Sequence, residues 1–244
     1  METRDVCIIG AGPAGLTAGI FTARADLDTL VLDGGDPILE RNAHVENVPG
    51  FPAGVNARRF LDLTREQAER NDCPIREGRV ERVSCREDGR FDVAVAESDE
   101  SLVAEYVICT SWADSDYLAD IDGVGLIKRG SKTYVDVDDR GESDVDGLYA
   151  AGRLAETHHQ TVVAAGDGAS AALTVIDDSD VPFYHDWVTP KGYFTERGRE
   201  VPPGCEEIDD DEREQREAEA RDVMQRHFSD PHPEAPSQHP SIEE

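Results

Sequence analysis

The spacing of apolar residues near the N-terminus predicts a strand, a helix and a second strand in succession. A continuous apolar run at 6–9 is followed, after a glycine-rich turn, by Leu16, Ile20 and Ala23 at helical spacing, and then by an apolar run at 29–32. Apolar residues three or four apart line one face of a helix, whereas short continuous runs are typical of buried strands. We therefore expect a helix at about 13–25 between two buried strands.

The next part of the chain predicts a second helix and three strands. From about 56 to 71, behind the favourable N-cap residue Asn56, one helical face carries Phe60, Leu61, Leu63 and Ala68. The strand-like segments 79–84, 91–96 and 102–109 are separated by turn-forming residues. This pattern predicts a three-stranded antiparallel meander. Its last strand is apolar enough to enter a parallel sheet.

Two further elements follow a weakly patterned segment at 112–140. The segment 147–153 predicts a buried strand that ends in glycine, and 160–176 predicts a helix rich in small residues. A glycine inside a helix costs about 1 kcal/mol relative to alanine. We therefore expect Gly166 and Gly168 to allow close approach to another backbone or to a flat ligand.

The composition changes after residue 182. Aromatic residues gather at 183–194 and predict a strap packed on the domain. The segment 209–228 predicts a charged helix with few apolar residues, and the Pro-, His- and Ser-rich segment 229–244 predicts a disordered tail. The chain is accordingly divided into a domain at 1–182, a strap with an acidic helix at 183–228, and a tail at 229–244.

The turn after the first strand has the spacing of a dinucleotide-binding site, with the sequence Gly-Ala-Gly-Pro-Ala-Gly at 10–15. Gly10 permits the tight turn, Gly12 lets the backbone approach a pyrophosphate, and Gly15 lets the helix pack on the strand. Free N–H groups at the helix start then face the phosphates. Asp33, 18 residues after Gly15, ends the second strand, where its carboxylate can accept a ribose hydroxyl. The alternative is a glycine turn that only packs.

The charge of the chain excludes some partners and indicates an environment. Acids number 53 against 24 bases, the net charge is −29, and only Lys128, Lys132 and Lys191 among the bases are lysines. An acid-rich, lysine-poor surface stays hydrated in molar salt, where the Debye length is about 3 Å. We interpret the composition as adaptation to a salt-loaded, haloarchaeal-type cytoplasm. Nucleic acid and anionic membrane are not expected as partners, because both need clustered Lys and Arg.

The cysteine and histidine spacings predict neither a zinc site nor a local redox dithiol. The five cysteines are never closer than 12 positions, and no CxxC or signal peptide is found, which indicates a reducing cytoplasm. Cys7 and Cys109 lie in apolar runs and are expected to be buried. We interpret His227, His232 and His239 as part of a solvated tail rather than as metal ligands. No apolar run approaches the length of a membrane span.

Six pieces of the chain together resemble the low-molecular-weight thioredoxin reductases, flavoproteins with two dinucleotide-binding domains. They are the turn at 10–15, Asp33, the sequence Val-Glu-Asn-Val-Pro-Gly-Phe-Pro at 45–52, the meander ending at 109–111, and the segments 146–152 and 160–172. The resemblance implies an α/β fold: a Rossmann-like FAD-binding domain with a central parallel sheet and an antiparallel meander, plus a helical and disordered acidic C-terminal extension. It also implies FAD as the cofactor and a homodimer.

The resemblance further implies, by position, which residues bind the cofactor. In that family the turn holds the FAD pyrophosphate, the acid holds the ribose, and the asparagine of the 45–52 element lies near the flavin. The opening strand of the meander offers backbone to the adenine, and the two late segments close over the ribityl chain and the ring. The implied residues are Gly10, Gly12, Pro13, Ala14, Gly15, Asp33, Gly34, Asn47, Val80, Gly152, Arg153, His159, Gln160 and Thr161. No catalytic residue and no metal ligand are implied.

The chain also departs from the family pattern. Only 35 residues lie between Thr110 and Asp146, where the family inserts an NADPH domain, and a domain usually needs about 50 to 250. The family's CxxC and a second glycine fingerprint are missing with it. Arg153 replaces an aspartate and could clamp the pyrophosphate. His159 replaces an arginine, and it could donate to the flavin, relay a proton, or with His158 simply cap the helix.

These features support one leading function and two alternatives. The leading hypothesis is an FAD-dependent oxidoreductase that is not itself a thioredoxin reductase and takes electrons from NAD(P)H, a redox protein or a small substrate. The strap at 183–205 could cover the open face of the ring, with Cys205 either a redox thiol or an ordinary residue. One alternative is a non-catalytic FAD-binding or cofactor-free interaction module, which the change at Arg153 favours. The other is a glycine turn that binds NAD.

Overall fold

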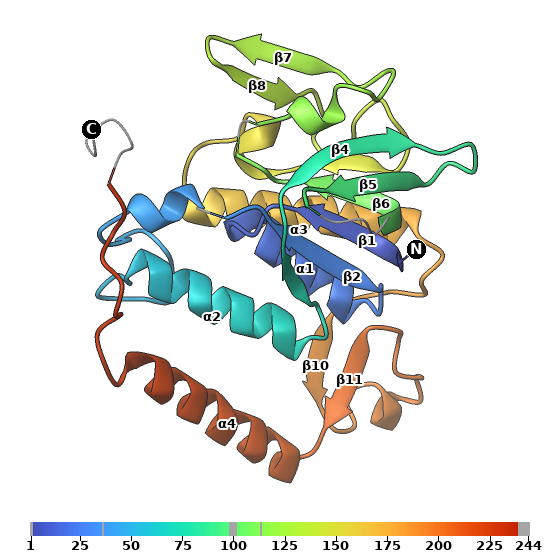
Figure 1. Ribbon diagram of the computed structural model, residues 1–244. Helices are drawn as coiled ribbons and strands as arrows, with labels where there is room; N and C mark the ends of the chain where they lie inside the picture. The colour runs from blue at the N-terminus through green and yellow to red at the C-terminus, as the bar shows by residue number, and fades with distance from the viewer. Residues whose placement is uncertain (1, 36, 98–101, 113, 239–244) are drawn as a thin grey trace.

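A seven-stranded sheet forms the centre of the molecule in the computed structural model, which describes residues 2–35, 37–97, 102–112 and 114–238 (Figure 1). The strand order is β3-β2-β1-β6-β5-β4, with β9 beside β6. The strands are β1 (Glu2–Ile9), β2 (Thr29–Asp33), β3 (Ile75–Glu77), β4 (Val80–Cys85), β5 (Phe91–Val95), β6 (Leu102–Cys109) and β9 (Leu148–Ala150). The predicted parallel sheet and antiparallel meander are both confirmed.

Strand β6 joins the parallel and antiparallel parts of the sheet. It pairs in parallel with β1, from Glu2 opposite Leu102 to Ile9 opposite Cys109. Its first residues pair antiparallel with β5, and its last three pair in parallel with β9. The apolar end of the meander therefore enters the parallel sheet, as its sequence predicts.

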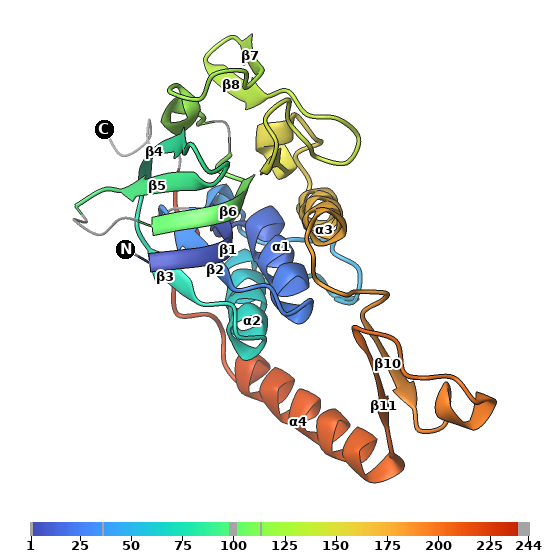
Figure 2. The same ribbon diagram turned by 90° about the vertical axis from the view of Figure 1, so that its right-hand side faces the viewer.

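Three helices cover one face of the sheet (Figure 2). They are α1 (Pro13–Arg24), α2 (Ala57–Arg70) and α3 (Thr161–Asp178). Pro13 stands in the first turn of α1, and the Asn56 side chain caps α2 by accepting from the N–H groups of Arg58 and Arg59. Both helix starts thus follow the chemistry read from the sequence.

Helices α1 and α3 touch through their backbones. A Cβ atom at Gly168 would lie 2.1 Å from the carbonyl oxygen of Ala14, whereas a Cβ atom at Gly166 would meet nothing within 4 Å. The expected close approach is therefore confirmed at Gly168 and wrong at Gly166, which faces open space.

Two apolar layers form the core, one on each face of the sheet. Alternate residues of β1 divide between them: Val6 and Ile8 face the helices, and Cys7 and Ile9 face the meander. Cys7 and Cys109 are fully buried, as expected, and burial raises the pKa of both thiols, that of Cys109 to about 12.

The weakly patterned segment before β9 contains structure that its sequence does not predict. It holds the short 3₁₀ helix η2 (Asp116–Leu118) and a hairpin of β7 (Leu126–Arg129) and β8 (Lys132–Val135). Tyr134 and Val135 are buried, but Leu126 on the opposite strand is exposed. This incomplete alternation explains why the pattern was weak.

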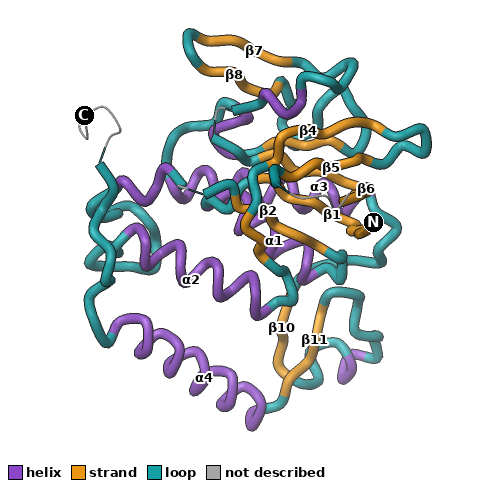
Figure 3. The backbone as a smooth tube through the Cα atoms, viewed as in Figure 1, coloured by secondary structure: helices purple, strands orange, loops and turns teal. Residues whose placement is uncertain are grey.

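The C-terminal part lies against the helical side of the domain. Strands β10 (Trp187–Pro190) and β11 (Cys205–Ile208) form a parallel pair, separate from the main sheet in Figure 3, with the 3₁₀ helix η4 (Thr195–Arg197) between them. The Arg24 guanidinium binds both carboxylate oxygens of Asp186 at 2.6 and 2.7 Å, which ties this pair to α1. The aromatic strap therefore contains a short two-stranded parallel sheet, which the sequence did not predict.

Helix α4 (Asp210–Phe228) runs beside α2 (Figure 1), and none of its residues is buried. Beyond it, the Asp230 carbonyl accepts from Arg59, and His232 Nε2 lies 3.1 Å from Asp62. His239 and the rest of 239–244 lie outside the described residues, and the disorder expected at 229–244 stays a prediction. Among the described residues, no helix is long and apolar enough to cross a membrane.

Candidate cofactor-binding site

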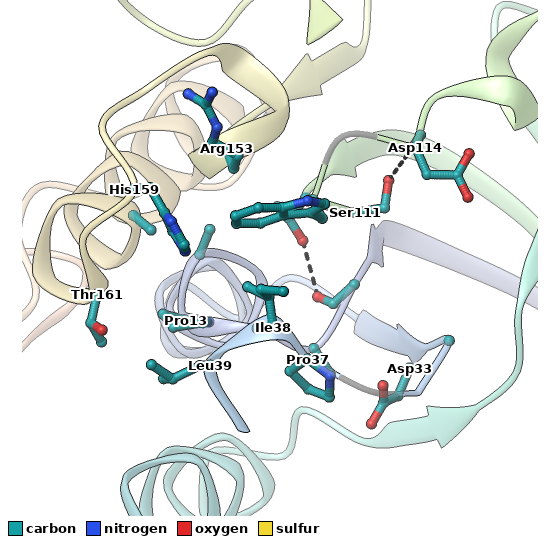
Figure 4. Close-up of a pocket in the computed structure, with 18 of the residues that line it drawn as sticks. Pro13, Asp33, Pro37, Ile38, Leu39, Ser111, Asp114, Arg153, His159 and Thr161 are labelled. Carbon is teal, nitrogen blue, oxygen red and sulfur yellow. Dashed lines mark hydrogen bonds between the residues drawn. The ribbon is translucent and has the colours of Figure 1, made fainter. Parts of the chain in front are cut away.

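A pocket of about 720 Å³ opens at the carboxyl ends of β2, β1 and β6 (Figure 4). Its walls include the residues that end or follow these strands: Ile9 and Gly10, Leu32 and Asp33, and Thr110 and Ser111. The chain leaves β1 toward β2 on one side, and β6 lies on the other side of β1. Parallel sheets bind ligands in the crevice formed where the connections diverge in this way. The volume of the pocket falls within the roughly 300–1,000 Å³ of small-molecule sites.

The glycine-rich turn forms the floor of this pocket. Gly10 has a φ of +114°, and a Cβ atom at Gly15 would lie 1.9 Å from the Gly10 carbonyl oxygen. A Cβ atom at Gly12 would meet nothing within 4 Å, so the space beside it is open. Gly12 is also the N-cap of α1 and makes no side-chain cap, which leaves first-turn N–H groups for a ligand.

Thr110 holds the turn from behind. Its Oγ1 lies 2.9 Å from the carbonyl oxygen of Ile9 and 3.0 Å from that of Gly10. A Cβ atom at Gly15 would also lie 2.6 Å from this hydroxyl. Gly15 therefore packs behind the pocket wall, whereas Gly10, Gly12, Pro13 and Ala14 line the pocket.

Asp33 ends β2 at the pocket, the place expected of a ribose-binding acid, but its carboxylate already has partners. It accepts from the Gly35 N–H at 2.9 Å, and its other oxygen pairs with Arg65 of α2. Gly34 and Val80 line the pocket beside it. Arg65 was not predicted, and its place on the polar face of α2 carried no signal that it would reach Asp33.

The structure brings together two residues that are 113 positions apart and were each predicted near the flavin. Asn47 Nδ2 donates to Gln160 Oε1 at 2.6 Å. Val45, two residues before Asn47, is anchored by paired backbone hydrogen bonds with Val55 at 2.8 and 2.9 Å. Gln160 is the N-cap residue of α3, and Thr161, the first residue of the helix, also lines the pocket. The pair presents amide groups at one end of the pocket.

Gly152 and Arg153 do not lie as the sequence suggested. Gly152 is behind the wall: a Cβ atom there would lie 2.9 Å from the Ala14 Cβ, and its N–H donates to Asp167 of α3 at 2.6 Å. Arg153 lines the pocket, but its guanidinium donates to the Tyr134 hydroxyl and the Thr157 carbonyl. In Figure 4 it points away from Pro13, and its clamp on the pyrophosphate stays a prediction.

Asp167 of α3 places a carboxylate beside Gly152, but it does not line the pocket. Burial raises its pKa, against the lowering effect of hydrogen bonds from the Gly152 N–H and the Thr157 hydroxyl. This contact was not predictable, because Asp167 lies among small residues of α3.

His159 contacts an aromatic residue instead of capping α3. Its ring meets that of Trp112 edge to face, with centroids 4.5 Å apart, and Gln160 at the helix start makes no side-chain cap. Burial, and then the charges of Arg153 and Lys132, lower the pKa of His159. This shift favours the neutral imidazole.

Other wall residues were missed. Ile38 and Leu39 come from the short 3₁₀ helix η1 (Ile38–Arg41), and Trp112 and Tyr117 come from the segment after β6. Trp112 lies three residues after the carboxyl end of β6. That position was the one signal in the sequence that Trp112 could line the pocket. Asp36, between β2 and η1, lies outside the described residues.

The strap does not cover this pocket. All described residues that line it fall between 9 and 164, and none comes from 183–205. The Cys205 sulfur lies 3.2 Å from the His185 carbonyl oxygen, and burial, then Asp186, raises the pKa of its thiol. The expectation that the strap shields a flavin is wrong, and Cys205 has no activated thiol there. Within the described part of the chain, no group of three His, Cys, Asp or Glu side chains could hold a metal.

The residues that are present fit FAD. The open space at Gly12, the uncapped start of α1 and the acid at the end of β2 provide for a diphosphate and a ribose. The amide pair of Asn47 and Gln160 provides polar groups for a heterocyclic ring at the other end.

Sequence comparisons agree with this geometry. Residues 5–40 match the FAD binding domain family. The bifunctional thioredoxin reductase/thioredoxin of Mycobacterium leprae is 36% identical over 128 residues, which are 52% of this chain and 28% of that protein. The thioredoxin reductase of Streptomyces coelicolor is 46% identical over 72 residues, 28% of this chain and 22% of that protein. The matches thus span about a quarter of the length of these relatives.

Solved structures share the fold. A thioredoxin reductase from Gloeobacter violaceus superposes with a TM-score of 0.66 at 17% identity, covering 76% of this chain and 100% of that one. A ferredoxin-flavin thioredoxin reductase from Clostridium acetobutylicum gives 0.60 at 16% identity, covering 73% and 98%. The chain therefore has the Rossmann-like FAD-binding fold seen in thioredoxin reductases, and its cofactor is FAD.

Proposed function

We propose that this chain is an FAD-dependent oxidoreductase that exchanges electrons with an outside donor, either NAD(P)H or a redox protein, and that it does not itself reduce thioredoxin. The observation that carries the proposal is the joining of the glycine turn, Asp33 and the Asn47–Gln160 pair around one pocket. FAD supplies the electron chemistry in such a site, and the protein supplies binding and orientation.

Two features support an outside donor. The described residues between β6 and β9 form η2 and the β7–β8 hairpin, which leave no room for a second dinucleotide fold. The sequence also contains no CxxC, the dithiol that reduction of thioredoxin requires in the family it resembles. We propose the domain division 1–182, 183–228 and 229–244 on the same grounds.

Each group of pocket residues has a defined task in this proposal. The first-turn N–H groups of α1 bind the diphosphate, and the partial positive charge of the helix start favours its charge. Asp33, held by Arg65 and the Gly35 N–H, accepts the ribose hydroxyl. Asn47 and Gln160 orient the ring, and neutral His159 can donate or accept one hydrogen bond beside it.

The test is an absorption spectrum followed by an anaerobic titration. Protein purified in multimolar salt, or incubated with FAD, should show bands near roughly 370 and 450 nm, which belong to oxidised flavin. Bleaching by NADH or NADPH would identify a nicotinamide donor, whereas bands that only a reduced redox protein bleaches would identify a protein donor. A folded protein that takes up no FAD would contradict the proposal and favour a cofactor-free interaction module.

A pair of glutamine variants sharpens this test. Gln160→Ala should weaken FAD binding by about fivefold, because it removes a hydrogen-bonded amide from the pocket, a contact usually worth about 1 kcal/mol. Gln215→Ala is the matched control, because Gln215 is exposed on α4, outside the pocket. Equal affinities for the two variants would remove Gln160 from the site.

A further inference from the structure

Trp112 adopts a backbone conformation that a bulky residue rarely takes. Its φ is +40°, in the left-handed region, three residues after β6 ends at Cys109. Such a conformation persists when surrounding contacts hold it, and it occurs often at ligand sites. The Trp112 N–H also donates to the Thr110 carbonyl at 3.0 Å. This hydrogen bond holds Trp112 close to Thr110, which contacts the glycine turn.

Contacts from two separate elements hold the Trp112 indole at the pocket. His159, from the loop before α3, meets it edge to face at 4.5 Å and 71°. The Lys132 ammonium, from the start of β8, lies 5.3 Å from the ring centroid. Trp112 and His159 both line the pocket, so their contact joins the β6 side of the pocket to the α3 side.

The contact between Trp112 and His159 lies at the cofactor pocket rather than in the hydrophobic core. Trp112 is only partly buried, and it lies two residues after Thr110, whose hydroxyl donates to the Gly10 carbonyl. In Figure 4, His159 lies above Pro13, whereas Ser111 lies to the right of it and turns its hydroxyl toward Asp114. A diphosphate at the start of α1 would lie beneath the aromatic pair.

We propose that Trp112 and His159 form an aromatic bridge over the diphosphate-binding part of the pocket, and that this bridge opens for FAD to enter or leave. The proposal rests on the proposed function, because it assumes the same FAD site. Trp112 and His159 act as positioning residues, with Lys132 holding the indole from outside. The bridge slows both entry and release, so that bound FAD is retained.

The first experiment observes the bridge without flavin. The chain contains two tryptophans, and Trp187 lies in β10, outside the pocket, so Trp187→Phe leaves Trp112 as the sole emitter. ADP carries the diphosphate and adenosine of FAD but does not absorb tryptophan emission. Saturating ADP should change the emission of Trp112 and its quenching by acrylamide. No change at ADP concentrations that compete with FAD would contradict a bridge over the diphosphate.

The second experiment measures FAD association and dissociation by stopped-flow flavin fluorescence. Trp112→Ala should raise both rate constants by about five- to thirtyfold, the effect expected from losing one aromatic pair and one cation–π contact. His159→Ala should raise both in the same way, and Trp112→Phe, which keeps a ring against His159, should stay near the parent rates. A merely structural role for Trp112 would lower the association rate instead.

The outcomes separate this proposal from the proposed function. If the unmodified protein binds neither FAD nor ADP, the FAD site itself is wrong. If it binds FAD and Trp112→Ala leaves both rate constants unchanged or slows association, only the bridge is wrong.

Discussion

Two glycines of α3 that are two residues apart have opposite surroundings. Gly168 meets the Ala14 backbone, and Gly166 faces open space. The sequence shows both as glycines in one small-residue helix, and helical spacing alone does not say which one faces α1. The same limit applies to Arg153 and Trp112, whose side-chain directions depend on Tyr134 and Lys132 of a hairpin that the sequence did not predict. Asn47 and Gln160 were predictable because each stands in a motif, but their mutual hydrogen bond was not.

Alanine substitution at these two glycines should have opposite effects on stability. Gly168→Ala should destabilise the protein by at least about 2 kcal/mol, because the new methyl group would force α1 and α3 apart. Gly166→Ala should stabilise it by up to about 1 kcal/mol, because it removes backbone freedom from the unfolded chain and adds no clash. Urea unfolding monitored by circular dichroism would measure both. A neutral or stabilising Gly168→Ala would show that the two helices are not in backbone contact.

At the scale of elements, α4 is attached to α2 through polar side chains rather than a buried apolar seam. Glu66 of α2 lies 2.6 Å from Arg226 and 2.6 Å from His227, and Arg70 lies 2.6 Å from Glu219. The sequence predicted a charged helix here. It did not predict that this helix contacts α2, because charged residues on a helix surface do not specify a partner. The parallel β10–β11 pair was missed for a related reason, since a short ladder with both faces half exposed has no clear alternation.

The attachment of α4 should weaken in acid. The hydrogen bond from His227, then that from Arg70, lowers the pKa of Glu66 to about 2. A carboxyl group with a lowered pKa stabilises the folded contact above its usual pKa near 4.5, and this stabilisation is lost as the pH falls toward 2. Amide hydrogen exchange in α4, corrected for its intrinsic pH dependence, should therefore accelerate across that window.

A pair of glutamate variants isolates Glu66. Glu66→Gln should accelerate α4 exchange at pH 7, because it removes the charge that pairs with Arg226 and His227. Glu69→Gln, on an exposed position of the same helix, should leave α4 exchange unchanged. Equal protection of α4 in both variants would show that Glu66 does not hold this helix.

At the scale of the whole molecule, the net charge of −29 acts against compactness. The central sheet was predictable because its strands are continuous apolar runs and its turns contain glycine and proline. The glycine turn and Asp33 predicted where the pocket lies, because their spacing belongs to a known motif. The pocket walls after β6 were not predictable, because Trp112, Tyr117 and the hairpin come from a segment with no regular period.

Salt should stabilise the protein. Raising KCl from 0.1 to 2 M shortens the Debye length from about 10 Å to less than 3 Å and screens the repulsion among surface acids. The thermal midpoint should rise by about 2–4 °C for each kcal/mol of repulsion removed. The gain should be smaller near pH 4.4, the isoelectric point, where the net charge vanishes. An unchanged midpoint at pH 7 would contradict adaptation to a salt-loaded environment.

The pairing of β1 with β6 has a consequence for biosynthesis. Strand β1 leaves the ribosome about a hundred residues before its partner at 102–109, and Gln160 emerges later still. Domains fold as their parts emerge during synthesis at about 5–20 residues per second. The nascent glycine turn therefore waits several seconds, without Thr110 behind it, before a cofactor can be captured. During that interval the apolar edge of β1 is open to wrong partners, which makes this chain a candidate for chaperone protection until β6 arrives.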